Sequence, residues 1–369
     1  MPKATETVLE IDLTALGKNY HYLKSRIKDT TKLLGVVKAF AYGSDAVIIA
    51  KELEALGVDY LAVAYVNEGV VLRDFGIKTP ILVLHPQVEN FEILINRCLE
   101  PNLYNESVLK QFIKIASEKK QHNYPVHLKF NTGLNRLGFN ETEVNKIVKE
   151  LSSTSTIKVA SLFSHLAASE DLTEKDFSES QIISFKNIAE NISSKLNYQP
   201  KLHMSNTSGI LNYPDAQFDM VRSGIGLYGF SNIPEEQKNF SPIVTLKSVI
   251  SQIHTVKKGD SVGYNRAFKS KRTTVSATIP IGHADGISRA YGNGKGWVMV
   301  RGIKAPIIGN ICMDMMMINV TGIVCKEGDE VIVFGGDNKA DLLAETIESI
   351  SYELLTAISQ RVKRLVYRK

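Results

Sequence analysis

A lysine stands at the end of a short apolar run near the N-terminus, where it is placed for chemistry. Leu33–Val37 is a continuous apolar run of the kind that a strand buried on both faces requires, and Lys38 follows it directly. A helical pattern, Ala46–Leu56, and a second apolar run, Tyr60–Ala64, complete a β-α-β unit. Lys38 then lies at the carboxyl end of a strand, where α/β folds place their active sites. A lysine in a partly dry site loses proton affinity and can form a Schiff base, although a single lysine at a strand end is more often a surface residue.

Four later predicted strands also end in residues that packing alone does not require. These are Lys129 and Arg136 after the fifth strand, His165 after the sixth, Asn206 and Thr207 after the seventh, and Arg222, Gly224 and Ile225 after the eighth. The last two loops are of the kind that holds phosphate with backbone N–H groups at a helix N-terminus. Each residue also has an ordinary interpretation as a structural histidine, an ion-paired arginine or a turn glycine. Together, a Schiff-base lysine, a phosphate cradle and arginines indicate pyridoxal 5′-phosphate, because an arginine facing the pyridine nitrogen is one of two standard partners of this cofactor.

Strands that must position these residues alternate with helical patterns such as Glu141–Leu151 and Glu179–Leu196. The eight predicted strands are Leu33–Val37, Tyr60–Ala64, Pro80–Leu84, Leu99–Leu103, Val126–Phe130, Lys158–Phe163, Lys201–Ser205 and Phe218–Arg222. Eight is the number at which a parallel sheet with helical crossovers closes into a (β/α)8 TIM-type barrel. The rival fold, an open doubly wound sheet, usually has a Gly-x-Gly-x-x-Gly turn after its first strand, and this sequence has none there.

The pattern changes near residue 235, where the barrel is expected to end. Ile243–Val256 alternates with period two, and β-rich segments then recur as far as Phe334. The clearest of these segments are Thr274–Ile281, Gly296–Arg301 and Met315–Val320, and closing helices are predicted over Leu342–Ile350 and Ser351–Arg361. The sequence therefore predicts a barrel domain over residues 1–235 and a mainly β C-terminal domain over residues 236–369. For the first ten or so residues, association with the β domain is the alternative.

The composition and net charge indicate which kinds of partner the protein is expected to lack. A hydrophobic content of 44% and a charged content of 22% are normal for a soluble globular protein. The net charge of +5 is scattered with no basic stripe, so no nucleic-acid partner is expected. No apolar run approaches membrane-spanning length and none resembles a signal peptide, so no membrane association is expected. Cys98, Cys312 and Cys325 lack metal spacing and cannot all pair, which fits a reducing cytoplasm without a metal site.

Several short motifs resemble those of one enzyme family, in the family's order and over both predicted domains. Val36-Val37-Lys38-Ala39-x-Ala41-Tyr42-Gly43 resembles the cofactor-lysine signature of alanine racemases, the fold-type III pyridoxal-phosphate enzymes. Further matches are Thr132-Gly133-x-x-Arg136-Leu137-Gly138, Met220-Val221-Arg222-x-Gly224-Ile225, Val262-Gly263-Tyr264-x-Arg266, Cys312-Met313-Asp314, Tyr352-Glu353 and Ile358-Ser359-x-Arg361-Val362. The resemblance covers nearly the whole chain. It implies a cytoplasmic, homodimeric isomerase that interconverts L- and D-alanine and supplies D-alanine for peptidoglycan.

The resemblance also implies a role for each matching residue at the cofactor. Lys38 would hold pyridoxal phosphate and act as one base, and Tyr264 of the partner subunit would act as the other. Arg222 would face the pyridine nitrogen, with support from His165. The residues around the phosphate would be Tyr42, Asn206, Thr207, Tyr352 and the backbone of Gly224 and Ile225.

Three more roles follow from the same resemblance. Arg136 would contact the phenolic oxygen of the cofactor and the substrate, and Met313 would shape the substrate entrance from the other subunit. Lys129 matches a lysine that is carbamylated in some members of the family. These roles imply active sites that are shared across a homodimer.

The chemistry of racemisation is consistent with these roles. The reaction removes the α-proton on one face of the substrate and replaces it on the other, so two bases must flank Cα. A tyrosine with an ordinary pKa of about 10 needs neighbouring positive charge to serve as a base. An arginine at the pyridine nitrogen keeps its proton, so the ring withdraws electrons less strongly and transamination is suppressed.

Two positions depart from the family pattern, and other functions stay open. Phe40 stands where asparagine is common, so the order of this strand end must come from packing, and Ser44 stands where histidine is common. The alternatives are a racemase of serine, lysine or another amino acid, a decarboxylase of the same fold type, and a non-catalytic pyridoxal-phosphate carrier. The carrier resembles the barrel alone and needs no second base, so the predicted β domain with Tyr264 argues against it.

Overall fold

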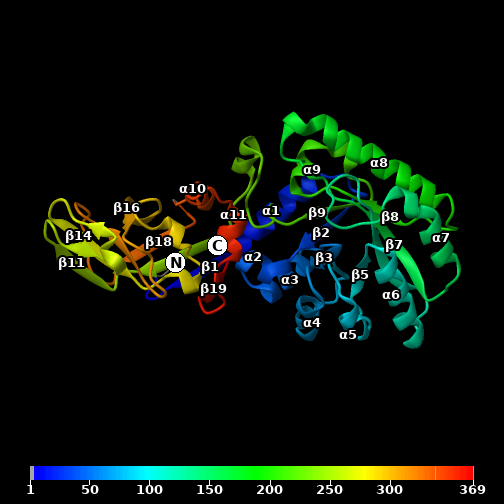
Figure 1. Cartoon of the computed structure of the whole chain (residues 1–369), viewed down its shortest axis with the longest axis horizontal. Helices are drawn as coiled ribbons and strands as arrows, with labels where there is room; N and C mark the ends of the chain where they lie inside the picture. The colour runs from blue at the N-terminus through cyan, green and yellow to red at the C-terminus, as the bar shows by residue number, and fades with distance from the viewer. Residues whose placement is uncertain (1–3, 337, 369) are drawn as a thin grey trace. The chain divides into compact units, whose positions relative to one another are not determined.

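The computed structural model describes residues 4–336 and 338–368, which form two compact units (Figure 1). The barrel unit comprises residues 17–41 and 46–241. The β unit comprises residues 42–45, the described residues up to Leu16 and those from Pro242 on. Residues 1–3 of the predicted N-terminal segment lie outside the described residues.

The strands of the barrel unit form a closed parallel barrel in chain order. They are β2 (Lys32–Val36), β3 (Tyr60–Val63), β4 (Ile81–Val83), β5 (Glu100–Leu103), β6 (Tyr124–Lys129), β7 (Ile157–Phe163), β8 (Lys201–His203) and β9 (Met220–Ser223). The barrel closes where β2 pairs in parallel with β9, with Leu34 opposite Arg222. The predicted TIM-type barrel and its eight strands are confirmed, and the strand ends differ from the prediction by two residues or fewer.

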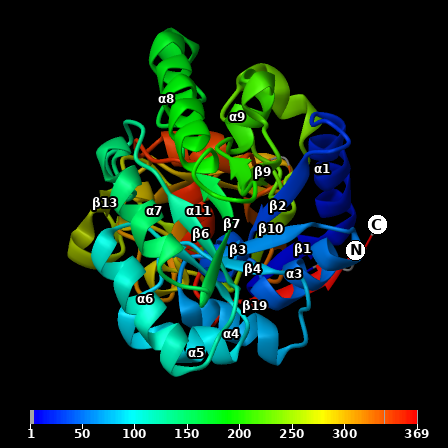
Figure 2. The same ribbon diagram turned by 90° about the vertical axis from the view of Figure 1, so that its right-hand side faces the viewer.

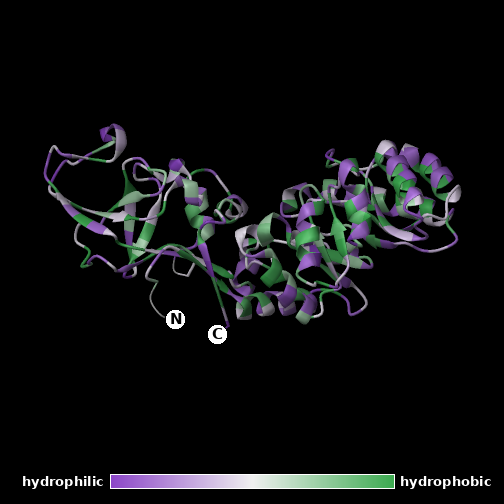
Figure 3. Cartoon of the chain, turned by 90° about the horizontal axis from the view of Figure 1, so that it is seen from below, coloured by the Kyte–Doolittle hydropathy of each residue, from purple (hydrophilic) through white to green (hydrophobic). Residues whose placement is uncertain are grey.

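Helices surround these strands (Figure 2). Their bounds are α1 (Leu13–Ser25), α3 (Ala46–Ala55), α4 (Val66–Asp74), α5 (Phe91–Asn96), α6 (Glu106–Glu118), α7 (Val144–Ser152), α8 (Lys175–Ser193) and α9 (Thr207–Asn212). In α6, Asn105 caps the first turn by accepting from the Val108 N–H at 2.9 Å, and Val108, Phe112 and Ala116 are buried on one face. Hydrophilic and hydrophobic residues accordingly alternate along the helices in Figure 3. Among the described residues, no helix combines the length and the apolar character needed to cross a membrane.

The β unit contains a nine-stranded sheet in the order β11-β14-β17-β16-β15-β18-β10-β1-β19. Its strands are β1 (Val8–Asp12), β10 (Val244–Val249), β11 (Gln252–Val256), β14 (Thr274–Ile279), β15 (Trp297–Val300), β16 (Ile303–Ile308), β17 (Met316–Asn319), β18 (Glu330–Phe334) and β19 (Lys363–Tyr367). The short pair β12 (Ser261–Val262) and β13 (Phe268–Lys269) and the helices α10 (Ala340–Glu345) and α11 (Ser351–Thr356) complete it. The predicted mainly β second domain is confirmed. β10 shows the predicted alternation, because Val244, Leu246 and Ser248 are buried and the residues between them are less so.

Both predicted closing helices are too long. The first ends at Glu345 instead of Ile350, and the second ends at Thr356 instead of Arg361. The residues after it form β19, which pairs in parallel with the N-terminal strand β1. This pairing joins residues more than 350 positions apart, which no local periodicity reports.

Candidate functional site

Lys38 opens a left-handed helical turn at the carboxyl end of β2. In α2 (Lys38–Gly43), the φ angles of Ala39, Phe40, Ala41 and Tyr42 are +53°, +53°, +53° and +54°. Each L-residue in this conformation costs roughly 1–2 kcal/mol, so four in a row cost several kcal/mol that the surrounding structure must offset. Strain of this kind at a strand end is a recurrent mark of a functional site.

Glu68 on α4 stabilises the start of this turn. Its Oε1 accepts from the backbone N–H of Ala39 at 2.6 Å, and its Oε2 accepts from Ala64 and Tyr65 at 2.7 and 3.0 Å. The carboxylate thus ties the residue after Lys38 to the end of β3. Glu68 carries no signal in the sequence, because a glutamate in the first turn of a helix also serves as an ordinary cap.

Phe40 and Ser44, the two residues that depart from the family motif, have different surroundings. The Phe40 side chain is 58% exposed, so this side chain is not itself packed into the strand end, and the Glu68 hydrogen bond to Ala39 contributes order there besides packing. Ser44 is buried in the β unit, and its hydroxyl has no hydrogen-bond partner among the described residues. The carbonyls of Gly43 and Ser44 accept from the Arg364 guanidinium at 2.8 and 3.1 Å.

Arg222, on β9, is held in the barrel by four hydrogen bonds. Its Nη1 donates to His203 Nδ1 at 2.7 Å, and its Nη2 donates to His165 Nδ1 at 2.9 Å. Nη2 also donates to the carbonyls of Ser164 and Met204 at 2.9 and 2.8 Å. Among the described residues, the Nε proton and one Nη1 proton have no acceptor, so this buried side chain keeps donors for a bound group.

Positive charge gathers around Arg222 in the barrel unit. Burial and Arg136 lower the pKa of Arg222 to about 9, so the guanidinium stays charged at neutral pH. Burial, Arg136 and Arg222 lower the pKa of Lys129 to about 8. Burial and Arg136 also lower the pKa of Lys38, against an opposing effect of Glu68. For His165, burial and Arg222 hold the pKa well below its ordinary value, so the imidazole is neutral. The structure thus brings together five of the predicted residues.

One aromatic ring lies beneath this cluster. The Phe163 ring on β7 has the Lys129 Nζ 5.8 Å and the Arg222 Cζ 5.5 Å from its centroid. On this ring the His203 imidazole stacks at 4.7 Å with an interplanar angle of 3°. These contacts keep two like-charged side chains close to each other in a dry site.

The loops after β8 and β9 form a small polar cradle. Thr207 Oγ1 and Ser223 Oγ share a hydrogen bond of 3.1 Å, and the Gly226 N–H donates to Thr207 Oγ1 at 3.4 Å. A Cβ at Gly226 would stand 2.6 Å from the Thr207 methyl group, so only glycine allows this approach. Among the described residues, the N–H groups of Gly224 and Ile225 have no acceptor, and they can therefore bind an anion.

Asn206, which was predicted to bind the cofactor, caps α9. Its Oδ1 accepts from the Gly209 N–H at 2.8 Å and from Ser169 Oγ at 2.8 Å. This is the ordinary contact of an N-cap asparagine. A cofactor contact of its amide stays a prediction.

Four predicted residues lie in the β unit. The rings of Tyr42 and Tyr352 are 6.0 Å apart. Tyr264 is 72% exposed and Met313 is 59% exposed, and together with Gly263, Cys312, Asp314, Met315 and Met317 they line a pocket of about 370 Å³. Asp314 is bound to Arg361 at 2.7 Å, and the same guanidinium reaches Asp285 at 2.7 Å, which fixes the loop that carries Met313.

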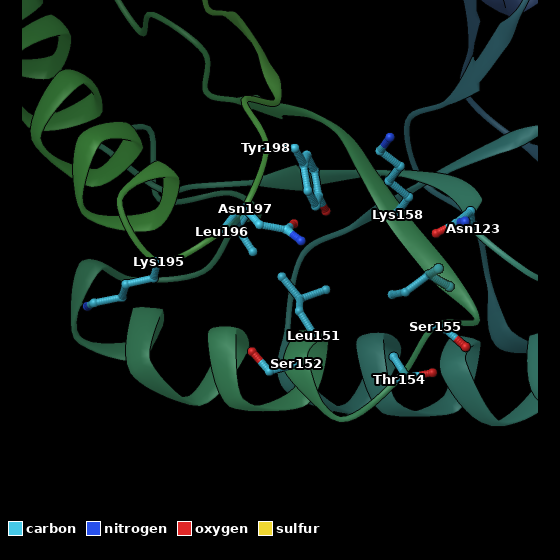
Figure 4. Close-up of a pocket in the computed structure, with 11 residues that line it drawn as sticks. Asn123, Leu151, Ser152, Thr154, Ser155, Lys158, Lys195, Leu196, Asn197 and Tyr198 are labelled. Atoms are coloured by element: carbon cyan, nitrogen blue, oxygen red, sulfur yellow. The ribbon is translucent and has the colours of Figure 1, made fainter.

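A larger pocket, of about 600 Å³, lies at the amino ends of the barrel strands (Figure 4). Asn123, Lys158 and Tyr198 line one side of it, and Ser152 and Thr154 line the other. The Lys158 ammonium lies 5.1 Å from the Tyr198 ring centroid. This pocket contains none of the predicted site residues and is at the end of the barrel away from the usual active site.

The residues at the carboxyl end fit pyridoxal phosphate. The fit depends on three observations of the barrel unit: an amine with lowered proton affinity, unpaired guanidinium donors and two free backbone N–H groups beside a threonine. These match the aldehyde, the ring nitrogen and the phosphate of the cofactor.

Comparisons with known proteins agree with this fit. The family model "Alanine racemase, N-terminal domain" matches residues 11–232, and "Alanine racemase, C-terminal domain" matches residues 243–366. An alanine racemase of Clostridium kluyveri is 38% identical over 370 residues, which cover 96% of this chain and 93% of that protein. The alanine racemase structure from Clostridium difficile 630 has a TM-score of 0.92 at 33% identity and covers 99% of this chain and 97% of its own.

A third relative is described with its cofactor. The structure of alanine racemase from Bartonella henselae "with covalently bound pyridoxal phosphate" has a TM-score of 0.89 at 28% identity and covers 99% of this chain and all of its own. The match to both domain models does not fit a carrier that resembles the barrel alone. The predictions of a pyridoxal-phosphate enzyme and of an alanine racemase, an isomerase, are confirmed. The barrel with its lysine, the β unit and these comparisons together show that the chain belongs to the alanine racemase family.

Proposed function

We propose that this chain interconverts L- and D-alanine with Lys38 and Tyr264 as its two bases, and that the D-alanine is used in peptidoglycan. The cluster of Lys38, Lys129, Arg136, His165 and Arg222 at the barrel mouth carries the proposal. A lysine with lowered proton affinity is available as a neutral amine, which is the form that can both bind an aldehyde and remove a proton.

Three residues of the cluster are proposed to act directly around the reacting part of the cofactor. Pyridoxal phosphate, when bound, withdraws electrons from Cα and so acidifies the α-proton. Lys38 holds the cofactor and, once substrate has replaced it, moves the α-proton on one face. Arg222 donates to the pyridine nitrogen and, because it keeps its own proton, prevents the ring nitrogen from being protonated. His165 stays neutral beside it and accepts its hydrogen bond at 2.9 Å.

The remaining barrel residues are proposed to orient the cofactor. Arg136, whose side chain is exposed, is proposed to contact the phenolic oxygen of the cofactor and the substrate carboxylate. The free N–H groups of Gly224 and Ile225, with Thr207 and Asn206, bind the phosphate. The phenols of Tyr42 and Tyr352 complete the phosphate site.

Tyr264 is proposed to act from the partner subunit of a homodimer. Its side chain is 72% exposed, and the exposed Met313 and Met315 lie around the same pocket. Large exposed apolar side chains that share one pocket mark a surface that binds another molecule. A two-fold dimer would bring one chain's Tyr264 and Met313 to the other chain's Lys38 and would complete both sites at once.

Lys129 is proposed to carry a carbamate. Only a neutral amine reacts with carbon dioxide, and the pKa of about 8 leaves roughly a quarter of the Lys129 side chains neutral at pH 7.5. The carbamate would exchange a positive charge for a negative one beside Arg136 and so remove a repulsion. A carbon-13 resonance of a carbamate that is absent in Lys129→Ala would support this assignment.

Racemisation should be measured first, as the loss of optical rotation from each L-amino acid with and without added pyridoxal phosphate. We expect alanine to be the preferred substrate and the activity to depend on the cofactor. Preferred racemisation of serine or lysine would replace alanine as the substrate, and no racemisation of any amino acid would overturn the proposal. We also propose that the enzyme works in the cytoplasm.

Complementation tests the shared site. Lys38→Ala and Tyr264→Ala proteins should each be nearly inactive, and refolding them together should restore about a quarter of wild-type activity. Half of randomly paired dimers are mixed, and each mixed dimer has one intact site of two. Mixed dimers without activity would place the tyrosine in the same subunit as the lysine or remove it from catalysis.

A further inference from the structure

A continuous line of hydrogen bonds crosses the interior of the barrel and ends at Arg222. Glu100 Oε2 lies 2.8 Å from His127 Nε2, and His127 Nδ1 lies 2.6 Å from Ser161 Oγ. Ser161 Oγ lies 2.9 Å from His203 Nε2, and His203 Nδ1 lies 2.7 Å from Arg222 Nη1. The four residues before Arg222 come one each from β5, β6, β7 and β8. We call them the barrel relay.

The barrel relay is shielded from water. His127, Ser161 and His203 are at most 1% exposed, and the Glu100 side chain is 12% exposed. Strand register sets the first histidine opposite the serine, because His127 pairs with Ser161 across β6 and β7. Polar side chains on buried strands are costly unless every one is hydrogen-bonded, and here each has its partner.

Chemistry at the two ends fixes the direction of every hydrogen bond. A guanidinium only donates, so His203 Nδ1 must accept and its proton must be on Nε2. That proton is donated to Ser161, whose hydroxyl is then free to donate to His127 Nδ1. His127 in turn carries its proton on Nε2 and donates it to Glu100, a carboxylate that only accepts. Every donor therefore points from Arg222 toward Glu100.

The alternative protonation states leave a group without a partner. If His127 carried two protons, Ser161 would receive two donors and its own hydroxyl proton would have no acceptor within the barrel relay. If His203 carried a proton on Nδ1, two donors would face each other at 2.7 Å. Burial and the Arg222 charge hold the pKa of His203 well below its ordinary value, in agreement with a neutral ring.

Glu100 is itself fixed by a second buried group. The Tyr60 phenol hydrogen-bonds to Glu100, and burial together with the Glu100 charge raises the pKa of this phenol. The Tyr60 ring also packs edge-on against His127, with centroids 5.9 Å apart. Two donors thus converge on one carboxylate at the amino end of β5, at the opposite end of the strands from the cluster around Lys38.

We infer that Glu100 is a positioning residue: it fixes the tautomer of His127 from one end of the barrel relay, as Arg222 fixes that of His203 from the other, and the completed line holds the Arg222 guanidinium toward the pyridine nitrogen. This inference rests on the proposed function only for the role of Arg222 at the cofactor. The histidine tautomers depend only on hydrogen bonds within the chain, so they do not depend on the reaction that the protein catalyses. Glu100 acts through four intervening hydrogen bonds and touches neither cofactor nor substrate.

Three substitutions separate this role from a merely structural one. Glu100→Gln loses the charge but keeps an acceptor oxygen for His127, and its NH2 group can donate to the Tyr60 phenol oxygen, whereas Glu100→Leu removes the acceptor. Asn102→Leu, on the same strand, is the matched control: Asn102 is buried and donates to the Leu84 carbonyl at 2.7 Å, outside the barrel relay. All three should lower stability, but only Glu100→Leu should alter the tautomers.

The tautomers are measured in the holoenzyme by NMR, from the two-bond correlations between the carbon-bound ring protons and the ring nitrogen-15 nuclei of the histidines. Wild type, Glu100→Gln and Asn102→Leu should all show His127 and His203 as the Nε2–H tautomers. Glu100→Leu should show His127 as a mixture, with a shifted Arg222 guanidinium signal. The same variant should lose about tenfold in kcat with KM changed less than twofold, and should form more pyruvate from alanine, because Arg222 acts on the reacting state and not on binding.

The outcomes are distinguishable. Wild-type tautomers in Glu100→Leu, or an equal loss of kcat in Asn102→Leu, would overturn the inference. If Glu100→Leu fails to fold, Ser161→Ala interrupts the barrel relay without adding side-chain volume. In this variant His127 should keep its Nε2–H, while the His203 signals should shift. Unchanged His203 signals would count against the inference. If wild type does not racemise alanine, the proposed function fails, and the tautomer spectra still test the barrel relay.

Discussion

The barrel unit holds its proposed catalytic lysine within its own network, whereas the β unit presents its proposed catalytic tyrosine to solvent. Lys38 opens a strained turn that Glu68 anchors, and the nearby positive charge of Arg136 helps to lower its pKa. Tyr264 is 72% exposed, and the only side-chain hydrogen bond to its backbone among the described residues comes from Asn310 at 3.2 Å. The barrel unit therefore tunes its base by burial, while the β unit leaves its base to be tuned by whatever covers it.

The two halves of the proposed mechanism therefore depend on different parts of the protein. The proton affinity of Lys38 is set within one chain, so it should change little with assembly. The environment of Tyr264 should depend on assembly.

The largest effect is expected at Lys38. Lys38→Ala should lower racemisation at least about a thousandfold, because both the covalent link and one base are lost. Borohydride reduction of wild type followed by digestion should place the pyridoxyl tag on the peptide that contains Lys38. Lys38→Arg, which keeps the charge, should be equally inactive. A tag on Lys129 would contradict the assignment.

A directional loss is expected at Tyr264. Tyr264→Phe should slow α-proton exchange about a hundredfold for one enantiomer of alanine and much less for the other, since each base serves one face. Single-turnover exchange in deuterium oxide measures both directions. Tyr65→Phe, on an exposed tyrosine of the barrel unit, is the control. Equal loss for both enantiomers would favour a single base.

Acid should weaken the barrel unit through its buried histidines. His165 and His203 have pKa values well below the ordinary 6.5, so the unfolded chain binds more protons than the folded one. Stability should then fall as the pH drops below about 6.5, by up to about 1.4 kcal/mol per pH unit for each histidine.

Hydrogen exchange of β7 and β8 peptides between pH 7.5 and 5.5, corrected for the intrinsic rate, measures this slope in the barrel alone. His165→Gln should reduce the slope, whereas replacing the exposed His254 of the β unit should not. A slope that is unchanged in His165→Gln would show that its proton does not contribute.

The smallest effect is expected at Asn206. Asn206→Ala should destabilise the barrel unit by about 1 kcal/mol through loss of the cap on α9. Asn206→Asp keeps the capping oxygen and should restore most of this stability, as measured by denaturant unfolding. If the amide also contacts the cofactor phosphate, Asn206→Asp should still weaken cofactor binding. Equal cofactor affinity in wild type and Asn206→Asp would restrict the residue to capping.

The architecture and the family of this protein could both be predicted from the pattern of its residues. Apolar runs at regular spacing predicted all eight barrel strands, because a strand buried on both faces must be apolar throughout. The motifs around Lys38, Arg222 and Tyr264 indicated the family, because their residue types are dictated by one cofactor and one reaction.

The contacts that hold the site residues could not be predicted from the sequence, because they join residues that meet only in the folded chain. The left-handed turn after Lys38 depends on a glutamate almost thirty positions away, which local propensity does not report. In the sequence, the residues of the barrel relay stand apart, as single polar residues of four different strands: Glu100, His127, Ser161 and His203. Strand register brings them into one line, and the direction of that line follows from donors and acceptors that meet only when the barrel closes.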